Sequence, residues 1–167
     1  MAGWPELDVA ELLRRLTAGG VDFVVVGAMA MVLHGSARLT RDLDICFSTD
    51  EGNLDALGAV LVELKAALRG VRNPVPFVPD RETLRRVGLL TLETEAGPLD
   101  VMTQPAGAPA YERLRRRADR YDVGGFSILV ASLEDLLLMK RAAGRPQDLI
   151  DVEELEAIKR LRRRLGR

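Results

Sequence analysis

Hydrophobic and polar positions follow two periods along the chain, one typical of helices and one typical of strands. Residues 9–18 carry apolar side chains at intervals of three and four, and Asp8 precedes them as a helix cap. Residues 21–26 are β-branched and almost entirely apolar, which predicts a strand buried on both faces. The pattern then predicts a short helix over 28–33 and a second strand over 42–47.

The remaining sequence repeats both periods. Leucines at intervals of three and four predict a long helix that Gly70 can end, and Pro74 and Pro76 mark a connection after it. Gly97-Pro98 is typical of a hairpin turn between two short strands. Helices are predicted over 54–68, 111–118, 132–144 and 152–165, and strands over 89–95, 99–102 and 126–130. The order of elements indicates an α/β (α+β) fold with a mixed sheet, flanking helices and two C-terminal helices.

Length and composition indicate one globular domain over residues 1–167. Apolar residues make up 47% and charged residues 29% of the chain, which excludes the intrinsically disordered class. Cys46 is the only cysteine, so an intramolecular disulfide is excluded and a buried, reduced thiol is expected. The N-terminus has no basic start followed by an apolar stretch, and no segment is long enough to span a bilayer. We therefore expect a cytoplasmic protein without a membrane partner.

The formal net charge of −1 gives no overall attraction for nucleic acid, but the arginines are crowded into two runs. Such runs are usually solvated helix faces, and they are also what a phosphate-backbone partner needs. Aromatic residues make up only 4% of the chain, so base-stacking platforms are not expected. The two runs are Arg113, Arg115, Arg116, Arg117 and Arg120, and Lys159, Arg160, Arg162, Arg163, Arg164 and Arg167.

Candidate chemistry centres on two aspartates one residue apart. Successive side chains of a strand point to opposite faces, so Asp42 and Asp44 share one face. Two carboxylates this close repel each other unless a cation lies between them, and Mg²⁺ binds carboxylate and phosphate oxygens. Asp100, on a later strand, supplies a third carboxylate, and three carboxylates can hold two metal ions for phosphoryl or nucleotidyl transfer. Gly27, at the preceding strand end, lets the backbone approach a phosphate.

Each candidate also has a structural interpretation. Asp-x-Asp occurs on the solvated face of edge strands, and acidic residues such as Asp100 often follow Gly-Pro turns for local reasons. Lys140 can be a solvated lysine near a helix end, and Asp148 can cap the final helix. His34 is the only histidine, which excludes a histidine metal cluster and makes a structural role the simpler interpretation.

The motifs resemble those of a known family. Gly27-Ala28, Asp42-Leu43-Asp44 and Asp100 are similar to the motifs of minimal nucleotidyltransferases of the polymerase-beta superfamily. The segment from Arg38 to Asp44, with Lys140 and the segment from Arg145 through Asp148 to Asp151, is more similar to the AbiEii-type branch, which includes toxin-antitoxin nucleotidyltransferases. The resemblance extends from about Val21 to Leu155.

The resemblance implies a mixed-sheet nucleotidyltransferase fold that binds NTP and one or two Mg²⁺ ions and transfers NMP to a hydroxyl. It implies RNA, such as a tRNA end, or a protein as the acceptor, and a cognate toxin or antitoxin as a partner. The implied roles are metal ligation and catalysis for Asp42, Asp44 and Asp100, catalysis for Asp148, and NTP contacts for Gly27, Ala28, Arg38 and Lys140.

One departure from the family pattern leaves an alternative function open. The family usually has Gly, Ser or Thr where this chain has Ala28, which has no hydroxyl donor and allows less close backbone approach than glycine. A degenerate fold that binds nucleotide or a partner protein without catalysis is therefore the main alternative. A third interpretation, an antibiotic nucleotidyltransferase, is disfavoured because the chain is short and lacks a further substrate-binding segment.

Overall fold

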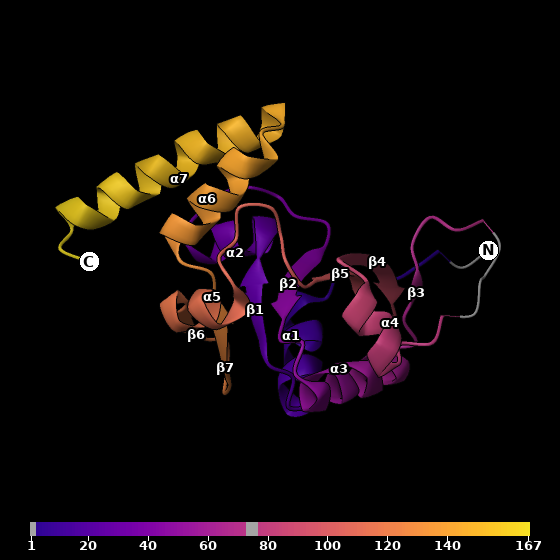
Figure 1. Ribbon diagram of the computed structural model, residues 1–167. Helices are drawn as coiled ribbons and strands as arrows, with labels where there is room; N and C mark the ends of the chain where they lie inside the picture. Colours follow the sequence, from indigo (N-terminus) through magenta and orange to yellow (C-terminus); the bar gives the residue numbers. More distant parts are fainter. Residues whose placement is uncertain (1–2, 73–76) are drawn as a thin grey trace.

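A central mixed sheet organises the protein in a computed structural model that describes residues 3–72 and 77–167 (Figure 1). The connection predicted at Pro74 and Pro76 lies outside these residues. The helices of the described chain are α1 (Val9–Ala18), α2 (Gly27–Leu33), α3 (Glu51–Glu63), α4 (Arg81–Arg86), α5 (Tyr111–Arg117), α6 (Leu133–Ala143) and α7 (Pro146–Arg164). Its strands are β1 (Phe23–Val26), β2 (Leu43–Phe47), β3 (Ala67–Leu68), β4 (Leu89–Thr94), β5 (Gly97–Met102), β6 (Asp119–Asp122) and β7 (Ser127–Val130).

The strand order is β3-β4-β5-β2-β1-β7-β6, so the mixed α/β fold predicted from the sequence is confirmed. β2 lies in the middle, antiparallel to β1 and parallel to β5, and β1 is parallel to β7. The register places Asp44 opposite Asp100 on β5 and opposite Val26 on β1. Three neighbouring strands therefore bring the glycine turn and two of the predicted carboxylates together.

Alternation along the central strands separates the core from the face that carries the carboxylates. On β2 and β5, Leu43, Leu99 and Val101 are buried, whereas Asp44 and Asp100 between them are half-buried. The buried side chains belong to one cluster with leucines of α1 and α3. α6 and α7 pack against each other beside α2, and the C-terminal part of α7 extends past α6 (Figure 1).

The helix predicted over 54–68 ends earlier than expected, at Glu63. Lys65 has a φ of 52°, in the left-handed region, and the Ala66 N–H donates to the carbonyl of Leu61 at 3.0 Å. This closing turn redirects the chain into β3, so Leu68 belongs to a strand although its spacing continues the helical stripe.

The turn predicted at Gly97-Pro98 lies two residues earlier, at Glu95-Ala96, and β5 begins at Gly97. Gly97 has a φ of 104°, and a Cβ there would lie 2.5 Å from the Cα of Leu7. The glycine is therefore needed because the N-terminal segment passes against this strand, where the Asp8 N–H donates to the Ala96 carbonyl at 2.9 Å.

Two further elements have no counterpart in the sequence prediction. α4 is a single short helix capped by Asp80, whose side chain accepts a hydrogen bond from the Thr83 N–H. β6 is a charged strand at the edge of the described sheet, and its mostly exposed polar residues lack the apolar alternation that identifies strands in a sequence. Within residues 3–72 and 77–167, no helix combines the length and the apolar character that crossing a bilayer requires.

Candidate active site

Three carboxylates meet at the centre of the sheet. Asp42 comes directly before β2, Asp44 lies on β2 and Asp100 lies on β5. Each offers one oxygen, and these three oxygens all lie within 4.8 Å of one another. The shared face of Asp42 and Asp44 was predicted from the strand period, and the parallel β2–β5 pairing seen in the structure adds Asp100 to it. The structure thus brings the three predicted metal ligands into one cluster, which we call the acidic cluster.

The crowding of like charges changes the ionisation of the acidic cluster. Burial, reinforced by the negative charges of Asp42 and Asp100, raises the pKa of the Asp44 carboxyl to about 7. Burial also raises the pKa of Asp100, against the opposing effect of the Arg69 guanidinium. Hard carboxylate oxygens at this mutual distance, with one ligand that resists ionisation in the absence of a counter-charge, fit a divalent cation such as Mg²⁺.

Gly27 makes room for the acidic cluster. It begins α2 with a φ of 67°, and a Cβ at this position would lie 2.0 Å from Oδ2 of Asp44. Any larger residue would therefore push the Asp44 carboxylate out of place. The sequence predicted a glycine that admits phosphate; the structure adds that this glycine also admits a carboxylate. Ala28 follows it on α2.

Basic side chains lie on a second side of the site, each paired with an aspartate from α7. Nζ of Lys140 on α6 lies 2.8 Å from Oδ2 of Asp151 and 3.3 Å from Oδ1 of Asp148, and its side chain is only 12% exposed. The Arg38 guanidinium also pairs with Asp151. Both aspartates are 1% exposed. The solvated-lysine interpretation of Lys140 is therefore wrong, because this ammonium group is held by two buried carboxylates.

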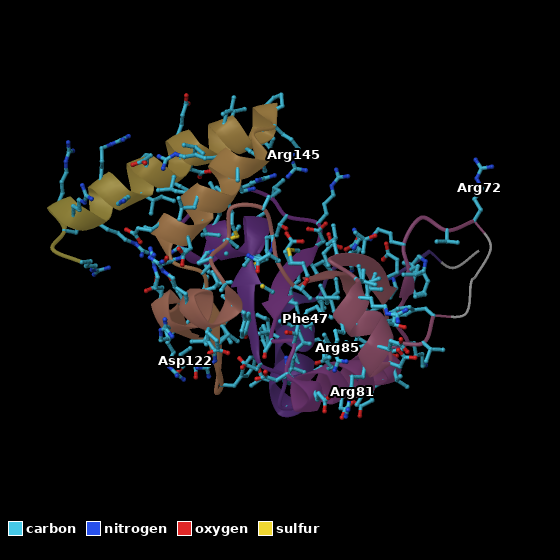
Figure 2. The ribbon with its side chains drawn as sticks, in the orientation of Figure 1. Phe47, Arg72, Arg81, Arg85, Asp122 and Arg145 are labelled. Atoms are coloured by element: carbon cyan, nitrogen blue, oxygen red, sulfur yellow. The ribbon has the colours of Figure 1, made fainter. Side chains whose placement is uncertain are left out.

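Asp148 has its own local role at the start of α7. Its carboxylate accepts hydrogen bonds from the backbone N–H of Arg145 at 3.1 Å and from Nε of Arg145 at 2.7 Å. The Arg145 guanidinium lowers the pKa of Asp148 to about 2. Asp148 is thus a capping residue in the third position of the helix, close to the capping role that the sequence suggested. Figure 2 shows Arg145 where α7 begins.

One cavity of about 380 Å³ joins the two sides of the site. The three residues of the acidic cluster line it, together with Gly27, Ala28, Arg38, Lys140, Arg145 and Asp148. Its remaining wall is mostly apolar: Val26, Leu89, Met102, Pro105, Ala106, Leu136, Met139 and Ala143. Every site residue predicted from the sequence therefore lines this cavity, which combines carboxylates, cations and apolar side chains.

Residues 11–164 match the family model described as "Nucleotidyl transferase AbiEii toxin, Type IV TA system". The chain belongs to the AbiEii nucleotidyltransferase family. The match includes every residue of the acidic cluster and of the basic side, so the resemblance identified from the motifs is confirmed. No curated protein sequence matches this chain.

Solved structures with the same fold include other nucleotidyltransferases. The lincosamide antibiotic adenylyltransferase LnuA bound to lincomycin has a TM-score of 0.62 and 18% identity, over 92% of this chain and 99% of LnuA. ANT(2'')-Ia in complex with adenylyl-2''-tobramycin has a TM-score of 0.51 and 12% identity, over 95% of this chain and 98% of that chain. A nucleotidyltransferase-like protein from Paracoccidioides brasiliensis has a TM-score of 0.50 and 17% identity, over 92% of this chain and 74% of that chain. At these identities the likeness establishes the nucleotidyltransferase fold alone.

Two residues near the acidic cluster of this AbiEii family member were not predicted from the sequence. Arg69 follows β3, and its guanidinium lies 2.9 Å from Oδ1 of Asp100 and 3.6 Å from Oδ2 of Asp42. The same guanidinium lies 3.1 Å from Oε1 of Glu93 on β4. Neither residue belongs to a recognised motif, and the contacts form only after β3, β4 and β5 pair. The sequence around Arg69 and Glu93 therefore gives no local indication that they lie beside the acidic cluster.

Other residues singled out in the sequence have structural roles. His34 is buried; its Nε2 donates to the Ala131 carbonyl at 2.8 Å, while Nδ1 accepts from Arg162 at 2.9 Å, and burial lowers the pKa of the imidazole. Cys46 is buried beside the core, which raises the pKa of its thiol to about 12. Both observations agree with the structural interpretations of these residues.

The two arginine runs meet in space. Residues from both runs line a second cavity of about 450 Å³, which we call the distal basic cavity. Its lining consists of Arg117, Asp119, Ser132, Leu133, Glu134, Lys159, Arg162, Arg163 and Arg167. Arg115 instead points elsewhere, with its Nε 3.0 Å from Oδ1 of Asp22. The first run is therefore divided between a structural ion pair and a surface that can hold an anion.

Proposed function

We propose that this AbiEii family member is a Mg²⁺-dependent enzyme that transfers NMP from NTP to a hydroxyl group. The observation that carries the proposal is the single cavity in which the acidic cluster of Asp42, Asp44 and Asp100 faces the cations Lys140 and Arg145. Carboxylates can hold the metal and the cations can hold the triphosphate, which are the two requirements of nucleotidyl transfer.

The proposed reaction is an in-line displacement at the α-phosphorus of NTP. The acceptor oxygen forms a bond to this phosphorus, the bond to the oxygen bridging the α- and β-phosphates breaks, and pyrophosphate leaves with the bonding electrons. The hydroxyl proton passes to Asp100, a carboxylate lining the same cavity whose pKa is raised by burial, as suits a proton acceptor. A bound divalent metal ion neutralises phosphate charge and aligns the reacting oxygens.

In this proposal Asp148 acts through the cations rather than on the substrate. Its carboxylate and that of Asp151 hold Lys140, and Asp148 also holds Arg145. Side chains fixed in this way lose less conformational freedom when they bind a triphosphate. The Arg145 side chain is nevertheless 75% exposed, so its guanidinium is accessible to the phosphates. We therefore assign Asp148 a positioning role and Lys140 and Arg145 the phosphate contacts.

The proposed acceptor is RNA, such as a tRNA end, or a protein, in a toxin-antitoxin system with a cognate partner. The family description, which names a toxin, and the distal basic cavity both support a macromolecular partner. A small-molecule acceptor is also compatible with the fold. LnuA is covered over 99% of its own length, so the shortness of this chain, which disfavoured an antibiotic substrate in the sequence, is no argument against one.

The experiment that tests the proposal supplies each labelled NTP with Mg²⁺ and either total RNA, total protein or lincosamide and aminoglycoside antibiotics. We expect a label on one acceptor class with wild-type protein and none with Asp44→Asn. Pyrophosphate release without any labelled acceptor would contradict NMP transfer. NTP binding without turnover in every mixture would favour the non-catalytic alternative.

A further inference from the structure

Arg69 approaches the acidic cluster from outside the cavity. Of these described residues, Asp42 and Asp100 line the 380 Å³ cavity, whereas Arg69 and Glu93 do not. The Arg69 guanidinium nevertheless lies 2.9 Å from an oxygen of Asp100 and 3.6 Å from an oxygen of Asp42. The two carboxylates therefore have an arginine on one side and the cavity on the other.

The guanidinium is held in this position by β4. Its Nη2 donates to the Leu92 carbonyl at 2.9 Å, the same nitrogen that lies against Asp100. Its Nε lies 3.1 Å from Oε1 of Glu93, whose side chain is only 12% exposed. A glutamate this buried requires a cationic partner, and a guanidinium presents donors in a rigid plane that can serve several acceptors at once. Arg69 is thus fixed by groups outside the acidic cluster.

Two roles are consistent with a cation beside metal ligands: it can occupy the metal position and compete, or it can orient the ligands from behind. Anchoring to Leu92 and Glu93 and the position outside the cavity favour the second role. Glu93 also neutralises the charge of Arg69, so the pair adds little net repulsion toward a metal ion. The contribution of the pair is therefore geometric.

We propose that Arg69, held by Glu93, is a positioning residue that orients Asp42 and Asp100 toward the metal ion. The proposal rests on the proposed Mg²⁺-dependent function and extends it to two residues outside the family motifs. Each carboxylate has an oxygen within 3.6 Å of the Arg69 guanidinium, and both residues also line the cavity. Groups that orient metal ligands in this way typically contribute about 10- to 100-fold to metal affinity.

The test uses the double variant R69M/E93Q, which removes the pair without changing net charge. Mn²⁺ affinity, measured by electron paramagnetic resonance without nucleotide, should fall by about 10- to 100-fold. The matched control is R81M/D55N, which removes a surface ion pair of 2.5 Å between α4 and α3 and should bind Mn²⁺ as wild type does. Figure 2 shows Arg81 on the opposite side of the view from Arg145.

The outcomes separate this proposal from the proposed function. Unchanged Mn²⁺ affinity in R69M/E93Q, with wild type binding normally, overturns the positioning role and leaves the metal-dependent function intact. Tighter binding also overturns it and assigns Arg69 to competition with the metal. Absence of Mn²⁺ binding by wild type overturns both. If the double variant does not fold, as circular dichroism would reveal, R69K replaces it: the charge stays, the planar fork is lost, and affinity should still fall.

Discussion

The carboxyl group of Asp44 is subject to three local effects at once. It is half-buried, it lies within 4.8 Å of two other carboxylates, and the backbone of Gly27 passes close enough to exclude any side chain there. Burial and the two neighbouring carboxylates both favour protonation of Asp44, whereas the glycine fixes where its oxygens lie. The behaviour of this one residue therefore reports on the whole site.

The stability of the metal-free protein should fall as the pH rises from about 4 to about 7. The pKa of Asp44 is about 7 in the folded state against 3.8 for the free side chain, so the folded state binds more protons in this window and loses that advantage as they dissociate. The slope should reach at most about 1.4 kcal/mol per pH unit and vanish above pH 7. Urea unfolding in EDTA measures it. Asp44→Asn, which cannot ionise, should flatten the slope, and an unchanged slope would refute the assignment.

Gly27→Ala should abolish Mn²⁺ binding because the new Cβ would displace Asp44. Gly20→Ala is the matched control: Gly20 has a φ of 72°, close to the 67° of Gly27, but no atom lies within 4 Å of its would-be Cβ. Both variants should lose about 1–2 kcal/mol of stability from left-handed strain. Only Gly27→Ala should lose the metal. Equal Mn²⁺ binding by the two variants would show that Asp44 can move without consequence.

Ala28→Ser should increase NMP transfer, because a hydroxyl beside the cavity can donate to a phosphate oxygen. Steady-state rates at saturating NTP, compared with wild type, measure the effect. If wild type is inactive and the serine variant active, the non-catalytic alternative describes the natural chain. Identical rates would mean that this turn does not contact phosphate.

Helices α6 and α7 are joined by ion pairs as well as by apolar packing. Lys140 on α6 is held by two aspartates of α7, and Gly144, with a φ of 64°, ends α6 just before α7 begins. Arg38, in the segment between α2 and β2, is tied to α7 through Asp151. The same contacts that orient the cavity's cations therefore also fix α7 against the sheet. Substitutions of these cations should therefore change both NTP binding and the free energy of unfolding.

Lys140→Met should lower the free energy of unfolding by about 1–3 kcal/mol, since it removes a partner from two buried carboxylates. Arg38 and Arg145 remain as partners, which keeps the loss below that of an isolated buried charge. The variant should also bind NTP more weakly. Lys159→Met, which removes a lysine 3.5 Å from Glu134 at the surface, is the control and should change neither quantity appreciably. An unchanged unfolding energy for Lys140→Met would argue against the pairing.

Elements with strong periodicity were predictable from the sequence, and elements defined by their partners were not. The central strands β1 and β2 and the helix α1 follow directly from apolar spacing, and the shared face of Asp42 and Asp44 follows from the strand period of two. β3 and β6 are short or charged strands whose identity depends on neighbours far away in the chain. Arg69 was missed for the same reason, because its acceptor Asp100 is 31 residues away.

Across the whole molecule, acidic and basic side chains gather in different places, although the formal net charge is only −1. The acidic cluster lies at the centre of the sheet, and the arginine runs converge near the N-terminal end of α6 and the C-terminal end of α7, at the distal basic cavity. This separation of acidic and basic groups cannot be read from the net charge. The two arginine runs are distant in sequence and come together only in the folded chain.

If the acceptor is RNA, affinity should fall steeply with salt as counterions are released. Replacing Arg163 and Arg167 with Ser should reduce the slope of log affinity against log salt by about two units at most, while NTP binding is unchanged. Arg85 and Arg86 on α4, replaced in the same way, are the control for lost charge. Filter binding at several salt concentrations measures both. Identical slopes in all three proteins would remove this surface as an RNA contact.

The parallel pairing of β2 with β5 has a consequence for how the protein is made. Parallel neighbours cannot be joined by a tight turn, and here α3, β3, α4 and β4 intervene between Asp44 and Asp100. On a translating ribosome, the chain that has emerged as far as β4 has only part of the proposed metal site. The acidic cluster is completed only when β5 inserts beside β2, so a nascent chain that lacks β5 should be unable to carry out the proposed reaction.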